Sequence, residues 1–229
     1  MLSQTTSSRT VSERRRVHDA NQAPIAAHAL SGHIEMMGAT MPFSRNAEIY
    51  GENEKADYIY KVLSGSVRTY KVLNDGRRQI GAFYLPGDLF GFEVGDVHAF
   101  SAEAVTDSKV LVIKRNAVST LADRDPEIAR QLWNMTAREL QRAQNHIMLL
   151  IKTAQERVAG FLLEMSTRST SANEIDLPMS RQDIADYLGL TIETVSRTLT
   201  QLENVAAIAV PTSRRIVLRN RGALSRLNS

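Results

Sequence analysis

Hydrophobic residues in the first half of the chain fall in short β-type segments separated by polar turns. These segments are Asp57–Leu63, Val67–Leu73, a third that ends at Phe83, Ser101–Thr106 and Lys109–Lys114. Asn74-Asp75-Gly76 and Pro86-Gly87-Asp88 supply two of the turns. Short strands at near-regular intervals predict an antiparallel sandwich or barrel, a β-roll that we place at residues 28–124.

From Asp123 to Ser166 the apolar residues recur at spacings of three, four and seven, as in a long helix that starts near Asp125-Pro126. The apolar seam comprises Trp133, Leu140, Ile147, Ile151, Ala154, Val158 and Phe161. Such a seam predicts a coiled coil, so we expect residues 125–153 to form a dimerisation helix. We assign its dimer interface to Trp133, Leu140, Ile147 and Ile151. Packing of this helix on its own domain is an alternative that is compatible with the first. A break near Ile151–Gln155 is expected to separate a second helix, Ala154–Arg168.

Ser180–Asn204 has the pattern of two helices joined by a tight turn. Ser180 can cap the first helix in a capping box with Asp183, and Gly189 can end it in the left-handed conformation. Thr191 can cap the second helix. Three apolar residues then recur on its inner face, namely Val195, Leu199 and Leu202. This arrangement predicts a helix-turn-helix, whose second helix enters the DNA major groove.

The outer face of that second helix carries side chains that can recognise bases. Arg197 can donate two hydrogen bonds to a guanine, and Glu193 can accept one from a cytosine. We assign base reading to Ile192, Glu193, Ser196 and Arg197. The alternative is that Glu193 and Arg197 merely form an exposed ion pair, worth about 0.3–0.5 kcal/mol.

Two further β segments follow, Ala207–Val210 and Arg215–Arg219, and they predict the hairpin wing of a winged helix. Arg214 at its tip is a candidate phosphate contact, although a solvated turn explains it equally well. We expect this domain to span residues 154–229. The predicted fold class is thus α+β, with an N-terminal antiparallel β-roll, a long dimerisation helix and a C-terminal winged helix-turn-helix.

Composition narrows the possible functions. The 229 residues carry a formal net charge of +3, which permits nucleic-acid binding without indicating it. Neither a run of about 18 apolar residues nor a secretory signal is present, so we expect a cytoplasmic protein without membrane contact. Residues 1–27 are polar and are expected to form a flexible arm.

The side chains that commonly hold cofactors are scarce. Because the chain has no cysteine, disulfides, thiolate zinc sites and cysteine-ligated iron–sulfur clusters are excluded. The five histidines lack the spacing of a metal site, so we expect neither metal nor cofactor; they are His18, His28, His33, His98 and His146. Whether Ser180 replaces a native cysteine stays open at this point.

Together these motifs resemble the CRP/FNR family of transcription regulators over about residues 45–225. The resemblance rests on LPMSRQDIADYLGLTIETVSR, GDLFGF and QERVAGFLLEM, and the E-T-V-S-R wording is similar to the FNR and FixK branches. It implies that Glu193, Ser196 and Arg197 read a TTGA- or TTG-type half-site. It also implies phosphate contacts from Ser180, Arg181, Gln182, Thr191 and Thr194.

Departures from the family pattern concern the control of activity. Phe92 and Phe100 stand where relatives that bind cyclic nucleotides have a ribose-binding Glu and a phosphate-binding Arg. We therefore expect no cyclic-nucleotide site and expect Phe100 to fill the pocket. The resemblance then implies a FixK-type homodimer that binds palindromic DNA without an effector. It also implies contact with RNA polymerase and activation of microaerobic and nitrogen-fixation genes. Alternatives are a β-roll that binds an unrecognised ligand, a repressor, and, most remotely, an enzyme.

Overall fold

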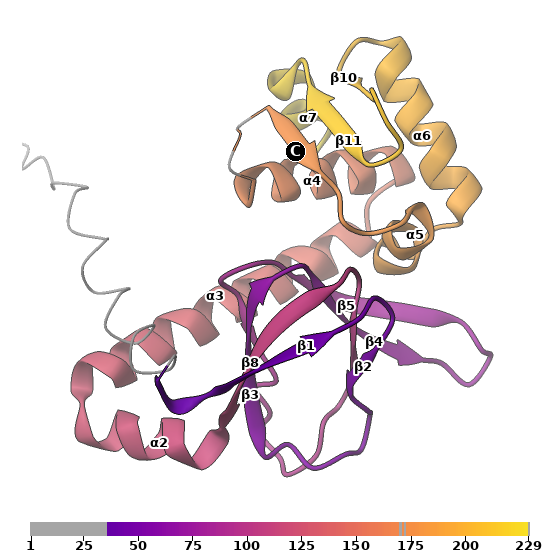
Figure 1. Cartoon of the computed structure of the whole chain (residues 1–229). Coiled ribbons are helices and arrows are strands. Elements are labelled where there is room, and N and C mark those ends of the chain that lie inside the picture. Colours follow the sequence, from indigo (N-terminus) through magenta and orange to yellow (C-terminus); the bar gives the residue numbers. More distant parts are fainter. Residues whose placement is uncertain (1–35, 170, 172, 229) are drawn as a thin grey trace, which may run out of the picture.

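The structure is a computed structural model that describes residues 36–169, 171 and 173–228. The described residues do not include the predicted arm at residues 1–27, which contains His18, nor the neighbouring His28 and His33. Figure 1 shows a β-roll, a long helix running past it and a second, mainly helical domain at the end of that helix. The predicted α+β fold class, with a β-roll and a C-terminal helix-turn-helix domain, is confirmed.

Two four-stranded antiparallel sheets face each other in the β-roll, with strand orders β1-β8-β3-β6 and β2-β7-β4-β5. The strands are β1 (Ala39–Phe43), β2 (Glu48–Tyr50), β3 (Tyr58–Ser64), β4 (Val67–Val72), β5 (Arg78–Tyr84), β6 (Leu89–Phe90), β7 (Ser101–Ala104) and β8 (Ser108–Lys114). The five predicted segments correspond to β3, β4, β5, β7 and β8, whereas β1, β2 and β6 were not predicted.

Aromatic rings fill the space between the two sheets. Four of them are buried: Tyr50, Tyr60, Tyr84 and Phe90. The imidazole of His98 stacks on the Tyr50 ring at a centroid distance of 3.6 Å. The expectation that Phe100 fills this interior is wrong. Its side chain is 37% exposed, and its ring covers Gly81, where the missing side chain leaves room.

Three helices follow the roll: α2 (Arg115–Arg124), α3 (Pro126–Leu150) and α4 (Ala154–Thr167). Helix α3 begins at the predicted place, because Asp125 accepts a hydrogen bond from the Glu127 N–H at 2.9 Å and Pro126 follows it. Helix α2 was not predicted.

The break after α3 falls where it was predicted, and Thr153 starts α4 with a capping box. The prediction that one apolar seam continues beyond this break is wrong for its last residues. Val158 and Phe161 lie on α4 and are buried in the core of the C-terminal domain.

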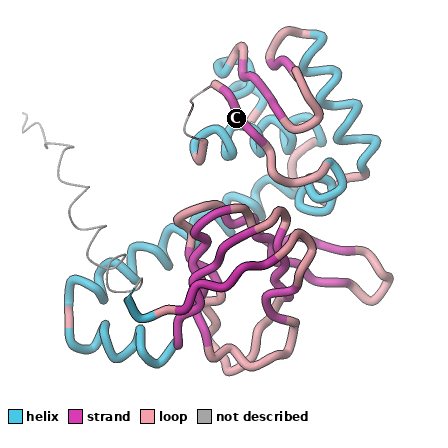
Figure 2. Tube along the Cα trace, viewed as in Figure 1, coloured by secondary structure: helices cyan, strands magenta, loops and turns pink. Residues whose placement is uncertain are grey.

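The C-terminal domain combines helices with a small antiparallel sheet of order β10-β11-β9. Its elements after α4 are β9 (Glu174–Asp176), α5 (Arg181–Leu188), α6 (Ile192–Asn204), β10 (Ile208–Ala209), β11 (Arg215–Leu218) and α7 (Arg221–Leu227). Figure 2 shows this mainly helical domain above the strands of the roll. One hydrophobic cluster joins the two, since Ile80 and Phe83 of β5 pack with residues of α4 and α5.

Candidate DNA-binding interface

Helix α5 starts with a complete capping box. Ser180 Oγ accepts from the Asp183 N–H at 3.1 Å, and the Asp183 carboxylate accepts from the Ser180 N–H at 3.0 Å. The reciprocal bonds satisfy two backbone donors that a helix start leaves without partners inside the helix. The prediction for Ser180 and Asp183 is confirmed, and the start of the helix is held in one geometry.

The turn between the two helices is also built as predicted. Gly189 has φ 62° and ψ 42°, the left-handed conformation that glycine adopts without a steric penalty. Thr191 then caps α6, where its Oγ1 accepts from the Thr194 N–H at 3.2 Å. The turn and both caps therefore fix the angle between α5 and α6.

Helix α6 has one buried face and one exposed face. Its inner residues lie in the domain core, as predicted; they are Val195, Leu199 and Leu202. Of the four residues assigned to base reading, Ile192, Glu193 and Arg197 are exposed and Ser196 is half-buried. All four lie in the first two turns of α6, so they can reach DNA together.

Glu193 is ready to accept hydrogen bonds. A bond to its own backbone N–H and one from Thr191 lower the pKa of the Glu193 carboxyl, with a smaller effect of Arg197. Among the described residues, no ion pair joins Glu193 to Arg197. Both side chains therefore remain available to other partners.

The residues assigned to phosphates are distributed around this face. Arg181 is half-buried and Gln182 exposed in the first turn of α5, while Thr191 and Thr194 lie at the start of α6. Arg214 is exposed at the tip of the wing between β10 and β11. The positions are compatible with a surface that follows a DNA backbone, and the phosphate contacts themselves stay predictions.

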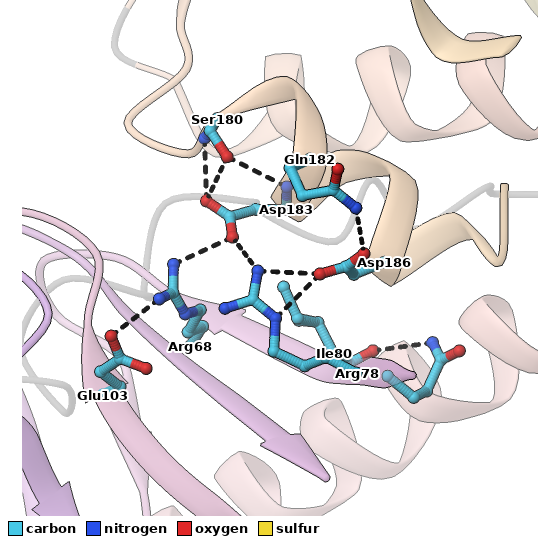
Figure 3. Close-up of polar contacts among 9 residues, drawn as sticks. Arg68, Arg78, Ile80, Glu103, Ser180, Gln182, Asp183 and Asp186 are labelled. Atoms are coloured by element: carbon cyan, nitrogen blue, oxygen red, sulfur yellow. Dashed lines mark hydrogen bonds and ion pairs between the residues drawn. The ribbon is translucent and has the colours of Figure 1, made fainter. Parts of the chain in front are cut away.

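Two arginines that sequence reasoning missed stand directly behind α5. Figure 3 shows Arg68 of β4 and Arg78 of β5 pointing at the carboxylates of Asp183 and Asp186. These partners are more than 100 residues apart in the chain. Because ordinary charged residues carry no local pattern, only the fold brings the two pairs together.

The predicted dimerisation face is exposed in the single chain. Trp133 is 75% exposed, and the other three assigned residues are exposed as well; they are Leu140, Ile147 and Ile151. Large apolar side chains gathered on one helix face are typical of an interface. Dimerisation through this face stays a prediction.

Phe92, the first departing position, and its neighbour Glu93 contact other side chains of the roll. Phe92 packs against the cluster of Ile59 and Leu89, and Glu93 lies within 3.4 Å of His98 Nδ1. In the described part of the chain, no group of three or more histidines or carboxylates could hold a metal ion, and no helix is long and apolar enough to cross a membrane.

Known proteins resemble this chain in both halves. A family model described as a cyclic nucleotide-binding domain matches residues 40–125, and one described as a Crp-like helix-turn-helix domain matches residues 156–227. The nitrogen fixation regulation protein FixK of Azorhizobium caulinodans is 52% identical over 86% of this chain and 82% of that protein. The protein of the same name from Rhizobium meliloti is 42% identical over 79% and 82% of the two chains.

The fold similarity is equally extensive. The structure of FixK2 from Bradyrhizobium japonicum has 52% sequence identity and a TM-score of 0.80, and the match covers 84% of this chain and 98% of that one. Sequence, domain order and structure lead to the same result. The chain belongs to the CRP/FNR family of helix-turn-helix transcription regulators, with FixK proteins among its relatives.

Proposed function

We propose that this protein is a homodimeric, sequence-specific regulator that binds its operator without a small-molecule effector and activates transcription. Its FixK relatives are named for the regulation of nitrogen fixation. The proposed targets are accordingly genes of nitrogen fixation and microaerobic respiration. A regulator of this kind acts through DNA and RNA polymerase, from the cytoplasm, and is not an enzyme.

The observation that carries the proposal is the row of Glu193, Ser196 and Arg197 at the start of α6, in which Glu193 and Arg197 are exposed and Ser196 is half-buried. The two capped helix starts and the Gly189 turn hold this row in a fixed position. Arg and Glu have the donors and acceptors for the two bases of G·C pairs, so the row supports reading of a TTGA- or TTG-type half-site.

The packing of the roll supports independence from an effector. Five rings occupy the space between the sheets, contributed by Tyr50, Tyr60, Tyr84, Phe90 and His98. A cyclic nucleotide in that space would have to displace them, and it would lack the arginine that relatives use to pair its phosphate. We infer that the roll serves as a scaffold and binds no cyclic nucleotide.

The exposed apolar face of α3 supports a dimer, and a two-fold dimer reads a palindrome. Two recognition helices would then enter successive major grooves about 34 Å apart. Ser180, Arg181, Gln182, Thr191, Thr194 and Arg214 are the proposed phosphate contacts.

Selection of binding sites from random DNA, with purified protein and no added small molecule, tests the proposal. We expect palindromic sites with TTG-containing half-sites. A selected pool without symmetry would contradict the dimeric reading mode. Failure to enrich any sequence until a cell extract or metabolite mixture is added would contradict effector independence and favour a ligand-binding roll.

A further inference from the structure

We propose that Arg68 and Arg78 are positioning residues through which the β-roll holds the helix-turn-helix ready for DNA, taking the place of an effector. This inference rests on the proposed function and deepens it. We call Arg68, Arg78, Asp183 and Asp186 the inter-domain clamp. The clamp joins strands β4 and β5 to helix α5, and Figure 3 shows its contacts.

Arg68 is the buried half of the clamp. Its Nη1 donates to Asp183 Oδ1 at 2.9 Å, and its Nη2 donates to Glu103 Oε1 at 2.8 Å. The side chains of Arg68 and Asp183 are only 7% and 6% exposed. An ion pair this deep is costly to break from one side, since the remaining charge stays buried without its partner.

Arg78 joins the same carboxylate from the neighbouring strand. Its Nη2 donates to Asp183 Oδ1 at 2.6 Å and lies 2.8 Å from Asp186 Oδ2, to which its Nε also donates. The guanidinium carbon lies 5.8 Å from the centroid of the Tyr70 ring. Arginines from two neighbouring strands thus contact carboxylates in two successive turns of α5.

The clamp and the capping box share one carboxylate. Oδ1 of Asp183 accepts from both arginines, while Oδ2 accepts from the N–H and the hydroxyl of Ser180. A shift of the roll relative to α5 would therefore act on the first turn of α5, which bears the proposed phosphate contacts Arg181 and Gln182. This shared group links the position of the roll to the DNA-facing surface.

The far end of α5 is held through backbone carbonyls, one of which, Leu188 O, accepts from Arg157 Nη1 of α4 at 2.9 Å. The Tyr187 carbonyl accepts from His146 Nε2 of α3 at 2.7 Å and from Gln79 Nε2 of β5 at 3.2 Å. With these contacts the roll and α3 fix α5 at both ends. The ion pairs between the roll and α5 lie at the end near the proposed DNA surface, where the arginines also neutralise two carboxylates that would repel phosphates.

Single variants provide the first test. We expect Arg78→Gln to weaken operator binding by about 5- to 150-fold, the range of typical coupling between sites. Arg77→Gln is the matched control, because Arg77 is adjacent but pairs with Asp75 in the exposed β4–β5 turn. Operator affinity is measured by fluorescence anisotropy at one salt concentration, and thermal unfolding of each variant is measured in parallel.

A double-mutant cycle then separates positioning from mere stability or charge. Asp186→Arg alone and Arg78→Asp alone each break the Arg78–Asp186 pair of the clamp, whereas Arg78→Asp/Asp186→Arg re-forms an ion pair of the opposite sense between the same two positions. We expect the double variant to recover most of the lost operator affinity and to restore protection of the α5 amides from hydrogen exchange. Unrelated DNA serves as the reference for sequence-independent attraction.

The outcomes are distinct. Wild-type affinity in Arg78→Gln, or a loss that the double variant does not restore, overturns the inference and leaves the proposed function intact. If the wild-type protein itself prefers no sequence, the proposed function fails before the clamp is considered.

Discussion

Arg197 and Glu193 lie one turn apart on the exposed face of α6, and each suits one base of a G·C pair. Arg214 differs from them in kind, because it lies at the wing tip, where only the DNA backbone is expected within reach. Base contacts set the sequence preference, whereas phosphate contacts set the position and strength of binding. The two kinds of residue can therefore be separated by experiment.

We expect Arg197→Ala to weaken binding by about 1–3 kcal/mol per half-site and to relax the preference at one base pair. Arg214→Ala is the matched control, since it should weaken all sequences equally and reduce the slope of log K against log salt by about one per half-site. Binding to a set of operators with single base changes measures both effects. An equal loss on every operator for Arg197→Ala would exclude base reading.

Residues with local roles were predictable from sequence. Ser180, Gly189 and Thr191 act on backbone groups within a few positions, so their types and spacing suffice. Phe100 and Arg68 illustrate what local reasoning misses. The ring of Phe100 lies over Gly81 of another strand, and Arg68 meets Asp183 at a distance of 115 positions. Both placements depend on the packing of the whole chain.

At the scale of the elements, α3 carries four large apolar side chains that are exposed in the single chain: Trp133, Leu140, Ile147 and Met148. Its inner face packs on its own chain through Ile128 and Leu149, while Trp133 and Ile147 point away from that core. The two interpretations of the seam are therefore compatible, since opposite faces of one helix can serve the two purposes. An exposed face of this kind in a family of DNA-binding regulators favours a second copy as its partner.

If α3 forms the proposed dimer, Ile147→Glu should convert it to a monomer, because two like charges would meet near the two-fold axis and apolar contacts would be lost. Arg138→Glu is the control, a charge reversal at an exposed site on the flank of the same helix. Sedimentation equilibrium measures the dissociation constant of each variant. A dimer that survives Ile147→Glu unchanged would place the interface elsewhere.

Elements with a strong start or a turn sequence were predictable, and the others were not. Helix α3 has Asp125 and Pro126 at its start, while α2 follows Lys114, which makes no side-chain capping bond. Strand β1 contains Pro42 and is almost entirely exposed, so it lacks the apolar pattern of a strand. Its antiparallel pairing with β8 therefore depends on the packing of the whole roll and cannot be inferred from the residues of β1 alone.

At the scale of the whole molecule, the contact of α3 with α5 should respond to pH. Burial lowers the pKa of His146 below its usual 6.5, although hydrogen bonds to the Tyr187 and Gly81 backbone oppose this. The unfolded chain then binds more protons than the native one as the pH falls through 6.5. The free energy of unfolding must therefore decrease in that window.

We expect His146→Gln to lose this contribution, so that the stability difference between wild type and variant shrinks as the pH falls below about 6.5. The comparison with the variant is essential, because burial raises the pKa values of the nearby Glu139 and Glu164, which act in the opposite direction. Urea unfolding between pH 5.5 and 7.5 measures the difference. A constant difference across this range would show that His146 titrates alike in both states.

The spacing of the two half-sites is the property that involves every part of the assembly. The roll fixes α5, α5 and the Gly189 turn fix α6, and α3 would set the distance between two copies of α6. Two helices held about 34 Å apart match half-sites one turn of DNA apart.

Five extra base pairs would rotate one half-site to the opposite side of the duplex, so we expect affinity to fall to the level of unrelated DNA. A series of operators with zero to ten inserted base pairs, measured by anisotropy, tests this. Undiminished binding at five inserted pairs would mean that each half-site is read independently, and would contradict a rigid dimer.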